Sequence, residues 1–280
     1  MNRRAWLCAS ASGITAAAAW TRYIEPRYFA LTRTQIRLPG VKPRRILHLA
    51  DIHMSDGMNA PDLEQGLRVG LAQKPDLICL TGDFVSTTSG FDRHGLSRFL
   101  RTAVASAPVL AVLGNHDGGA WLAHYGGSRS TQPIRDLISE SGVRLLHNES
   151  LVLGDLTLVG VGDYWSGEFE PDRAFAGAFT FAGVFKGAPR SAATLLLCHN
   201  PDAKRAVRHL PWDLMLSGHT HGGQVRVPGI TPRWAPVADK RFIAGLYGWE
   251  NKQLFITCGL GSPKHVRAFC RPEISLLEIV

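Results

Sequence analysis

Apolar runs of strand length recur along the chain at intervals of about thirty residues. The first three extend from Arg45 to Ala50, from Leu77 to Thr81 and from Val109 to Leu113. Helix-like stretches, Pro61 to Gln73 and His94 to Ala107, lie between them and are long enough to cross back over a sheet. Strands that alternate with helices of this length indicate βαβ units and a parallel arrangement.

More strands are expected later in the chain, but their connections look different. They cover Val143–His147, Leu156–Val161, Thr194–Cys198, Leu214–Leu216, Leu254–Thr257 and Ile274–Ile279. The last third is more hairpin-like, which favours a mixed sheet or two packed sheets over a purely doubly wound fold. Because residues 46–280 contain neither an internal repeat nor a low-complexity linker, we interpret them as one α/β domain.

The net charge of +8 is confined to the N-terminal region. Residues 1–45 contain nine Lys or Arg side chains and one acid, Glu25, whereas the remaining residues carry 22 basic and 22 acidic side chains. A duplex-binding protein needs a basic stripe on its folded body, so no nucleic-acid partner is expected. A basic segment beside an apolar one suits an anionic membrane surface, although ordinary solvated charge is the alternative.

The apolar segment from Ala5 to Trp20 contains no charge and follows Arg3-Arg4 directly. A helix of this length spans roughly 24 Å, less than the ~30 Å of a bilayer core. The pattern resembles an export signal, and Arg-Arg-Ala-Trp-Leu is a loosened twin-arginine sequence. We therefore interpret residues 1–22 as a cleaved signal, an uncleaved anchor or an interfacial segment, and residues 23–45 as a basic linker.

Polar motifs follow the early strands directly. Asp51-Ile52-His53 follows the first run, and its i, i+2 spacing turns both side chains the same way if the backbone is extended. Asp83 follows the second run, where an unpaired carboxylate would be costly, although a turn or helix-cap role is the alternative. Both motifs are weak evidence by themselves.

Three more motifs complete the set. Gly114-Asn115-His116-Asp117 follows the third run and supplies an amide, an imidazole and a carboxylate in one turn. His199 ends an apolar run, where a satisfied core histidine is the alternative, and His219-Thr220-His221 lies in a glycine-rich turn. Because ligands in open α/β sheets bind beyond the carboxyl ends of the strands, these motifs are expected to converge. Their N and O donors, without sulfur, favour Mn, Fe or Zn over a structural cysteine site.

Together these blocks resemble the calcineurin-like metallophosphoesterases, whose ordered motifs are D-x-H, G-D, G-N-H-D/E, a later strand-end H and G-H-x-H. The resemblance extends from about residue 45 to the C-terminus. It implies a four-layer α/β/β/α sandwich and two divalent metal ions. One ion would take Asp51, His53, Asp83 and His221, and the other Asp83, Asn115, His199 and His219. Asp83 would then bridge the pair.

A narrower resemblance points to the membrane-associated bacterial branch of that family. It lies in Tyr-Ile-Glu-Pro at 23–26, His199-Asn-Pro-Asp, His221-Gly-Gly-Gln-Val-Arg, Gly245-Leu-Tyr and Gly259-Leu-Gly. That branch contains twin-arginine-exported phosphoesterases and a UDP-2,3-diacylglucosamine pyrophosphatase of lipid A synthesis. The expected function is hydrolysis of a phosphodiester or pyrophosphate in a lipid-linked or envelope substrate. The protein would be a monomer at the inner membrane, or periplasmic after signal cleavage.

His116 is the histidine of the motif set that is not an assigned ligand. We expect it to contact the phosphate or protonate the leaving oxygen, with Asp117 orienting its ring. Trp121, Arg226 and Lys264 are candidate substrate contacts. Two other functions remain open: a nuclease or cyclic-nucleotide phosphodiesterase with the same metals, and a non-catalytic scaffold with this fold.

Overall fold

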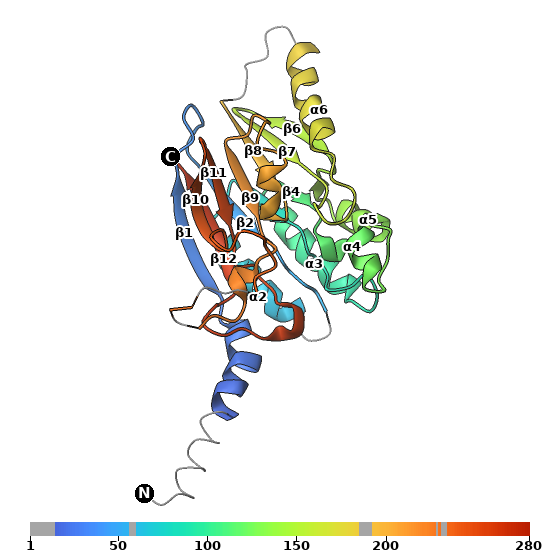
Figure 1. The fold of residues 1–280 in the computed structure, drawn as a ribbon, viewed down its shortest axis with the longest axis vertical. Coiled ribbons are helices and arrows are strands. Elements are labelled where there is room, and N and C mark those ends of the chain that lie inside the picture. The colour runs from blue at the N-terminus through green and yellow to red at the C-terminus, as the bar shows by residue number, and fades with distance from the viewer. Residues whose placement is uncertain (1–14, 56–59, 185–191, 228, 231–233) are drawn as a thin grey trace, which may run out of the picture.

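The computed structural model describes residues 15–55, 60–184, 192–227, 229–230 and 234–280 (Figure 1). Within them, two six-stranded sheets pack face to face, with helical segments on both outer faces. The expected four-layer α/β/β/α sandwich with two mixed sheets is confirmed. Arg3-Arg4 and most of the expected signal or anchor lie outside the described residues.

The first sheet contains the N- and C-terminal strands. In spatial order its strands are β1 (Ala30–Ile36), β12 (Glu273–Ile279), β2 (Arg44–Leu49), β3 (Leu77–Thr81), β4 (Val109–Val112) and β5 (Arg144–Leu145). The pairs β2–β3, β3–β4 and β4–β5 are parallel, whereas β12 runs antiparallel to β2. The three early apolar runs therefore form adjacent parallel strands, as their alternation with helices predicted.

The second sheet is also mixed. Its order is β10 (Gly245–Trp249), β11 (Lys252–Ile256), β9 (Leu214–Ser217), β8 (Ala193–Leu197), β7 (Leu156–Gly160) and β6 (Glu149–Leu153). Hairpin pairs, β10–β11 and β6–β7, lie at the two edges, and the four central strands are parallel. The β10–β11 hairpin accounts for the hairpin-like pattern of the last third, whereas the β6–β7 hairpin lies earlier in the chain.

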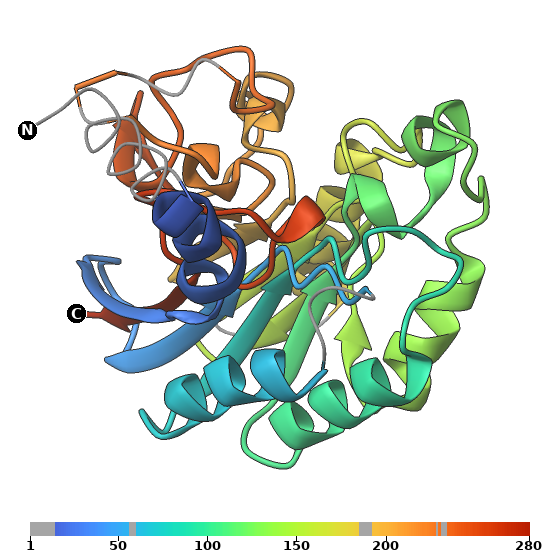
Figure 2. The same ribbon diagram turned by 90° about the horizontal axis from the view of Figure 1, so that it is seen from below.

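Apolar side chains fill each interface between layers. Helices α2 (Ala60–Leu71), α3 (Arg93–Val104) and α5 (Gln132–Glu140) cover the outer face of the first sheet (Figure 2). In α3, Asp92 caps the first turn by accepting from the Gly95 amide at 2.8 Å, and Leu96, Phe99, Leu100 and Ala103 form the buried stripe. Helix α6 (Pro171–Val184) and the segment 201–212 cover the second sheet.

The N-terminal segment is joined to the folded body more closely than a linker would be. Strand β1 lies within residues 23–45 and pairs in parallel with β12 along its whole length, so this stretch carries an edge strand. Before it, the helical turns η1 (Trp20–Ile24) and η2 (Glu25–Arg27) pack at the end of the body where the loops after β9 and β11 lie (Figure 1). Among the described residues, none of the helices has the length and apolar character needed to cross a membrane.

Candidate metal centre

The predicted ligands lie at the carboxyl ends of neighbouring strands in both sheets. Asp51, Asp83 and Asn115 follow β2, β3 and β4, while His199 and His219 follow β8 and β9. All are buried, with at most 3% of their surface exposed. Because these strands are parallel within each sheet, five separate motifs meet at one edge.

The donor atoms form two groups that share Asp83. One contains Asp51, His53, Asp83 and His221, and the other contains Asp83, His199 and His219. Within each group the ligand atoms all lie within 4.8 Å of one another. In the first, His53 Nε2 is 3.2 Å from His221 Nε2. In the second, His199 Nε2 is 3.2 Å from both Asp83 Oδ2 and His219 Nδ1. This arrangement matches a pair of cations bridged by one carboxylate.

Hydrogen bonds to carbonyl oxygens leave one ring nitrogen of His199 and one of His219 facing the donor cluster. His199 Nδ1 donates to Thr81 O at 2.7 Å, so its Nε2 faces Asp83. His219 Nε2 donates to Pro236 O at 2.9 Å, so its Nδ1 faces His199. Such bonds to carbonyl groups fix the tautomer of a metal-binding histidine.

Asn115 gives independent support for metal binding. Its Oδ1 is buried and has no hydrogen-bond partner in the structure, a costly state for an amide oxygen. A divalent cation would satisfy that oxygen. The residues therefore fit the second ligand set, in which Asn115 joins Asp83, His199 and His219.

Five of the ligands occupy the left-handed region of backbone space. The φ angles are 52° at Asp51, 49° at His53, 55° at Asp83, 70° at His219 and 51° at His221. Each such conformation costs about 1–3 kcal/mol, and strain of this kind is concentrated at functional sites. The prediction that Asp51 and His53 converge through an extended backbone is wrong, because the φ angles of both residues are positive.

Two glycines let the backbone approach the ligand carboxylates. A Cβ at Gly114 would lie 2.2 Å from Asp83 Oδ1, and a Cβ at Gly218 would lie 2.5 Å from Asp51 Oδ2. At Gly218 the close approach allows the His219 amide to donate to both oxygens of Asp51, at 3.0 and 3.1 Å. The glycines of these motifs are therefore required for space around the carboxylates.

Burial sets the protonation of most donors in the metal-free protein. It lowers the pKa of His219 to about 3 and the pKa values of His53 and His221 well below normal, so these rings are neutral and ready to bind a metal. Burial also raises the pKa of Asp51 to about 7. For His199, the Asp83 carboxylate outweighs burial and raises the pKa above its ordinary value.

Metal affinity is therefore expected to fall as the pH is lowered. A cation must displace a proton from His199 throughout the neutral range, and a second proton from Asp51 below pH about 7. Each displaced proton weakens apparent metal binding roughly tenfold for each unit by which the pH falls. We therefore expect the affinity to fall about tenfold per pH unit near pH 8 and up to about a hundredfold per pH unit below pH 7. Calorimetric titration of the chelator-treated protein with Mn²⁺ at pH 8, 7 and 6 measures this. Equal affinity at all three values would contradict it.

The structure places His116 at the edge of the donor cluster, between His53 and Trp121. Ring centroids are 4.9 Å apart for His116 and His53 and 4.7 Å apart for His116 and Trp121. The His116 amide donates to Asp83 Oδ1 at 2.9 Å, and its Nδ1 donates to Ser86 O at 2.7 Å. The bond to Ser86 O leaves Nε2 for a substrate oxygen.

Asp117 has a different role from the one expected. Its carboxylate accepts hydrogen bonds from the backbone amides of Asp83, Phe84 and Gly114 at 2.8–2.9 Å. The prediction that Asp117 orients the His116 ring is therefore wrong, because Ser86 O does so. Asp117 instead ties the turn after β3 to the turn after β4, which places Asp83 and Asn115 side by side.

An aromatic wall borders the donor cluster. The Trp121 and Trp165 rings are stacked with centroids 6.3 Å apart, and Trp165 contacts the His219 ring at 4.4 Å. Asp163 supports this wall by accepting from the Trp165 amide at 2.8 Å. The position of Trp121 is consistent with its predicted role as a substrate contact. Asp163 belongs to none of the sequence motifs, although it follows an apolar run as the ligands do.

The other predicted substrate contacts lie elsewhere. Arg226 Nε donates to Gly222 O at 2.6 Å and Nη2 lies 3.6 Å from Cys258 Sγ, so its side chain packs against the loop that carries His221. It lines a separate cavity with Cys258. Lys264 is exposed in the turn η6 (Pro263–His265). The structure therefore gives neither residue a place in the donor cluster.

Arg267 is a buried residue that sequence motifs did not reveal. Its side chain is fully buried, and its guanidinium donates to the carbonyl oxygens of Cys258, Gly259, Gly261, Cys270 and His221. It thereby joins the loop after β11 to the loop that carries His221.

Arg267→Met is expected to destabilise the protein by about 3–5 kcal/mol, because several buried carbonyl groups lose a charged donor. The free energy of unfolding in urea measures the change. Arg173→Met is the matched control, since the Arg173 side chain is 71% exposed. Equal stability of the two variants would show that water replaces the guanidinium.

Comparison with known proteins agrees with this geometry. Residues 44–223 match the calcineurin-like phosphoesterase family. The chain is 35% identical to phosphodiesterase YaeI of Escherichia coli, over 100% of both chains. It is 26% identical to the UDP-2,3-diacylglucosamine pyrophosphatase LpxG of Chlamydia muridarum, over 92% of each chain. It is 28% identical to the uncharacterized metallophosphoesterase YkuE of Bacillus subtilis, over 100% of this chain and 98% of the other.

These similarities and the donor cluster argue against a non-catalytic scaffold. A scaffold has no physical need for a shared carboxylate, neutral imidazoles and an unpartnered amide oxygen at one point. The chain belongs to the calcineurin-like phosphoesterases and is a metal-dependent phosphoester hydrolase.

Proposed function

We propose that the protein hydrolyses a phosphodiester or pyrophosphate bond in a lipid-linked or cell-envelope substrate, such as UDP-2,3-diacylglucosamine. The observation that carries the reaction is the position of Asp83 in both donor groups. The lipid-linked substrate is supported by the similarity to LpxG over 92% of each chain. It is also supported by exposed apolar side chains in the N-terminal segment, including Trp20, Tyr23, Ile24 and Tyr28.

The donor cluster suits two divalent cations, Mn, Zn or Fe, because it offers nitrogen and oxygen without sulfur. When bound, such cations neutralise phosphoryl oxygens and lower the pKa of a water molecule. His116 contacts the phosphate or protonates the leaving oxygen through Nε2, since Ser86 O already binds Nδ1. The stacked rings of Trp121 and Trp165 border this point.

The N-terminus would hold the protein at an anionic membrane surface as a monomer. The basic side chains of residues 1–45 and the neutral remainder support this arrangement. In the cell we expect the protein at the bacterial inner membrane, or in the periplasm if the N-terminal segment is cleaved. Cell fractionation with an antibody against the folded body distinguishes these locations.

A direct comparison of substrates tests the proposal. The purified full-length protein, loaded separately with Mn²⁺, Zn²⁺ or Fe²⁺, is incubated with UDP-2,3-diacylglucosamine, a cyclic nucleotide and bis-p-nitrophenyl phosphate. We expect UMP and the lipid monophosphate to form, with a kcat/KM at least about tenfold above that of the cyclic nucleotide. Hydrolysis of the cyclic nucleotide and the simple diester without the lipid would overturn the substrate class and favour the nucleotide phosphodiesterase.

A further inference from the structure

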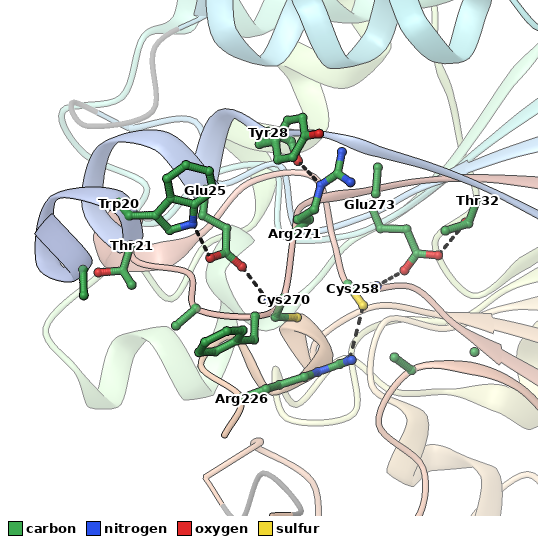
Figure 3. A pocket seen from close by; sticks show the side chains of 16 residues that line it. Trp20, Thr21, Glu25, Tyr28, Thr32, Arg226, Cys258, Cys270, Arg271 and Glu273 are labelled. Atoms are coloured by element: carbon green, nitrogen blue, oxygen red, sulfur yellow. Dashed lines mark hydrogen bonds between the residues drawn. The ribbon is translucent and has the colours of Figure 1, made fainter. Parts of the chain in front are cut away.

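A second cavity lies beside the metal centre, between the N-terminal segment and the C-terminal loops (Figure 3). Its volume is about 930 Å³, within the usual range for ligand sites. Residues of η1, η2 and β1 form one side, and the loops around 226, 244, 258 and 268–273 form the other. The metal ligands do not line it.

The acidic groups in the wall are bonded to other parts of the wall. Glu25 accepts from Trp20 Nε1 at 3.1 Å and from the Cys270 amide at 2.7 Å. Glu273 accepts from Thr32 Oγ1 at 2.6 Å and from the Cys258 amide at 2.7 Å. Figure 3 shows both carboxylates turned toward these partners. Their charge is thereby satisfied without a ligand.

The two arginines of the wall are similarly engaged. Arg271 lies over the Tyr28 ring, with 3.6 Å between its Cζ and the ring centroid, and its Nε donates to Tyr28 O at 2.8 Å. Arg226 bonds to Gly222 O and Cys258 Sγ. With the polar groups paired in this way, the cavity presents mainly the carbon and sulfur surfaces of aromatic, alanine and cysteine side chains.

The rim of the cavity is apolar and open to solvent. Trp20, Tyr28 and Phe269 line it and are 46%, 54% and 72% exposed. A smaller hollow of about 390 Å³ shares Trp20 and Tyr28 and adds Tyr23 and Ile24. Exposed aromatic side chains around an apolar opening are typical of surfaces that meet a lipid interface.

We infer that this cavity binds one acyl chain of an anionic membrane phospholipid. The chain would lie among the apolar side chains of the wall, and the phosphate would remain at the rim. Arg226 and Arg271 line the cavity and Arg27 lines the adjoining hollow, so basic side chains are available to an anionic head group at the rim. Arg27 is also ion-paired with Asp62 at 2.8 Å, which holds its side chain in place on η2. This inference goes beyond the proposed function, because it holds for any substrate of the metal centre.

The wall of the cavity is in packing contact with a loop of the metal centre. A Cβ at Gly222 would lie 2.5 Å from Cys258 Sγ and 2.9 Å from Cys270 Sγ, so the loop that carries His221 packs directly against two cysteines of the cavity wall. Cys270 Sγ also lies 3.3 Å from His221 O. A lipid held here would therefore keep the metal centre at the membrane surface.

Binding of monoacyl glycerophosphates tests the inference. Octanoyl, decanoyl and dodecanoyl forms are titrated by calorimetry below their micellar concentrations. We expect one molecule per chain and roughly a tenfold gain in affinity for each two methylene groups, as complete burial of the chain requires. Affinity that does not depend on chain length would overturn the inference, and this measurement needs no variant.

A cavity-filling variant locates the site. Ala268 lines the cavity, so Ala268→Phe should weaken binding of the dodecanoyl form at least about tenfold. Ala72→Phe is the control, because Ala72 is exposed and lies outside the lining. Both variants should hydrolyse bis-p-nitrophenyl phosphate at the normal rate, which separates this result from failure of the proposed function. Unchanged binding by Ala268→Phe would overturn the inference. A second result would also overturn it: the parent protein binds no lipid but forms a dimer, and Ala268→Phe abolishes that dimer. A second copy of the chain would then occupy the cavity.

Discussion

Asp83→Asn is expected to abolish most of the activity, lowering the rate by at least about 10³-fold, because one carboxylate serves both cation positions. Its Oδ2 lies 3.2 Å from His199 Nε2 and 3.5 Å from His53 Nε2. An asparagine keeps one oxygen but loses the charge and the second acceptor. The bound metal should fall from two ions per chain to one or fewer.

The same substitution should also change the protein without metal. Burial alone would raise the pKa of Asp83, but His199 and His116 outweigh it and hold that pKa well below normal. The charged carboxylate therefore balances the His199 ring, whose pKa is raised in turn. Removing it leaves a buried imidazolium without a partner, so the chelator-treated variant should be less stable than the chelator-treated parent.

Metal analysis by mass spectrometry and hydrolysis of bis-p-nitrophenyl phosphate measure these effects. Asp172→Asn is the matched control, since the Asp172 side chain is 82% exposed on α6. Two bound ions and normal turnover in Asp83→Asn would show that another group bridges the cations. Loss of metal with unchanged stability after chelation would contradict only the electrostatic argument.

The buried strands could be predicted from the sequence because their side chains are apolar on both faces. Strand β3 agrees with its prediction residue for residue, and β2 and β4 agree within one residue at each end. Strand β1 was missed for the opposite reason. It lies at the edge of the first sheet, and its sequence Ala-Leu-Thr-Arg-Thr-Gln-Ile includes an arginine and mostly half-buried side chains. Charge within the basic segment concealed a strand that is held by its pairing with β12.

The ligands could be predicted because each follows a strand end, and parallel strands bring their carboxyl ends together. The backbone conformation at the ligand residues could not be predicted from the sequence. Positive φ angles at Asp51 and His221 are imposed by contacts between distant loops, and no local residue pattern requires them. Arg267 shows the same limit, because a lone arginine looks like surface charge until its five carbonyl partners converge from separate loops.

The aromatic and apolar features divide between two regions of the molecule. Trp121 and Trp165 border the donor cluster, whereas Trp20, Tyr28 and Phe269 surround the second cavity. Arg226 belongs to the second region, although its motif follows His221 directly in sequence. Arg226 is turned away from the donor cluster by its bonds to Gly222 O and Cys258 Sγ.

His116→Ala is expected to lower kcat by about 10²- to 10⁴-fold while the bound metal stays at two ions per chain. The ring is outside the two donor groups, so its removal leaves their atoms in place. His124→Ala is the control, because His124 is an exposed histidine on the neighbouring helix α4 (Gly119–His124). Metal loss in His116→Ala would show that the ring holds a cation or supports the ligands.

The leaving group separates the two roles that remain for His116. If the ring protonates the leaving oxygen, His116→Ala should slow hydrolysis of an alkyl diester far more than hydrolysis of a p-nitrophenyl diester, since p-nitrophenolate departs without a proton. If the ring only contacts the phosphate, both esters should slow equally. Because Nδ1 donates to Ser86 O, Nε2 is the ring atom that would protonate the leaving oxygen.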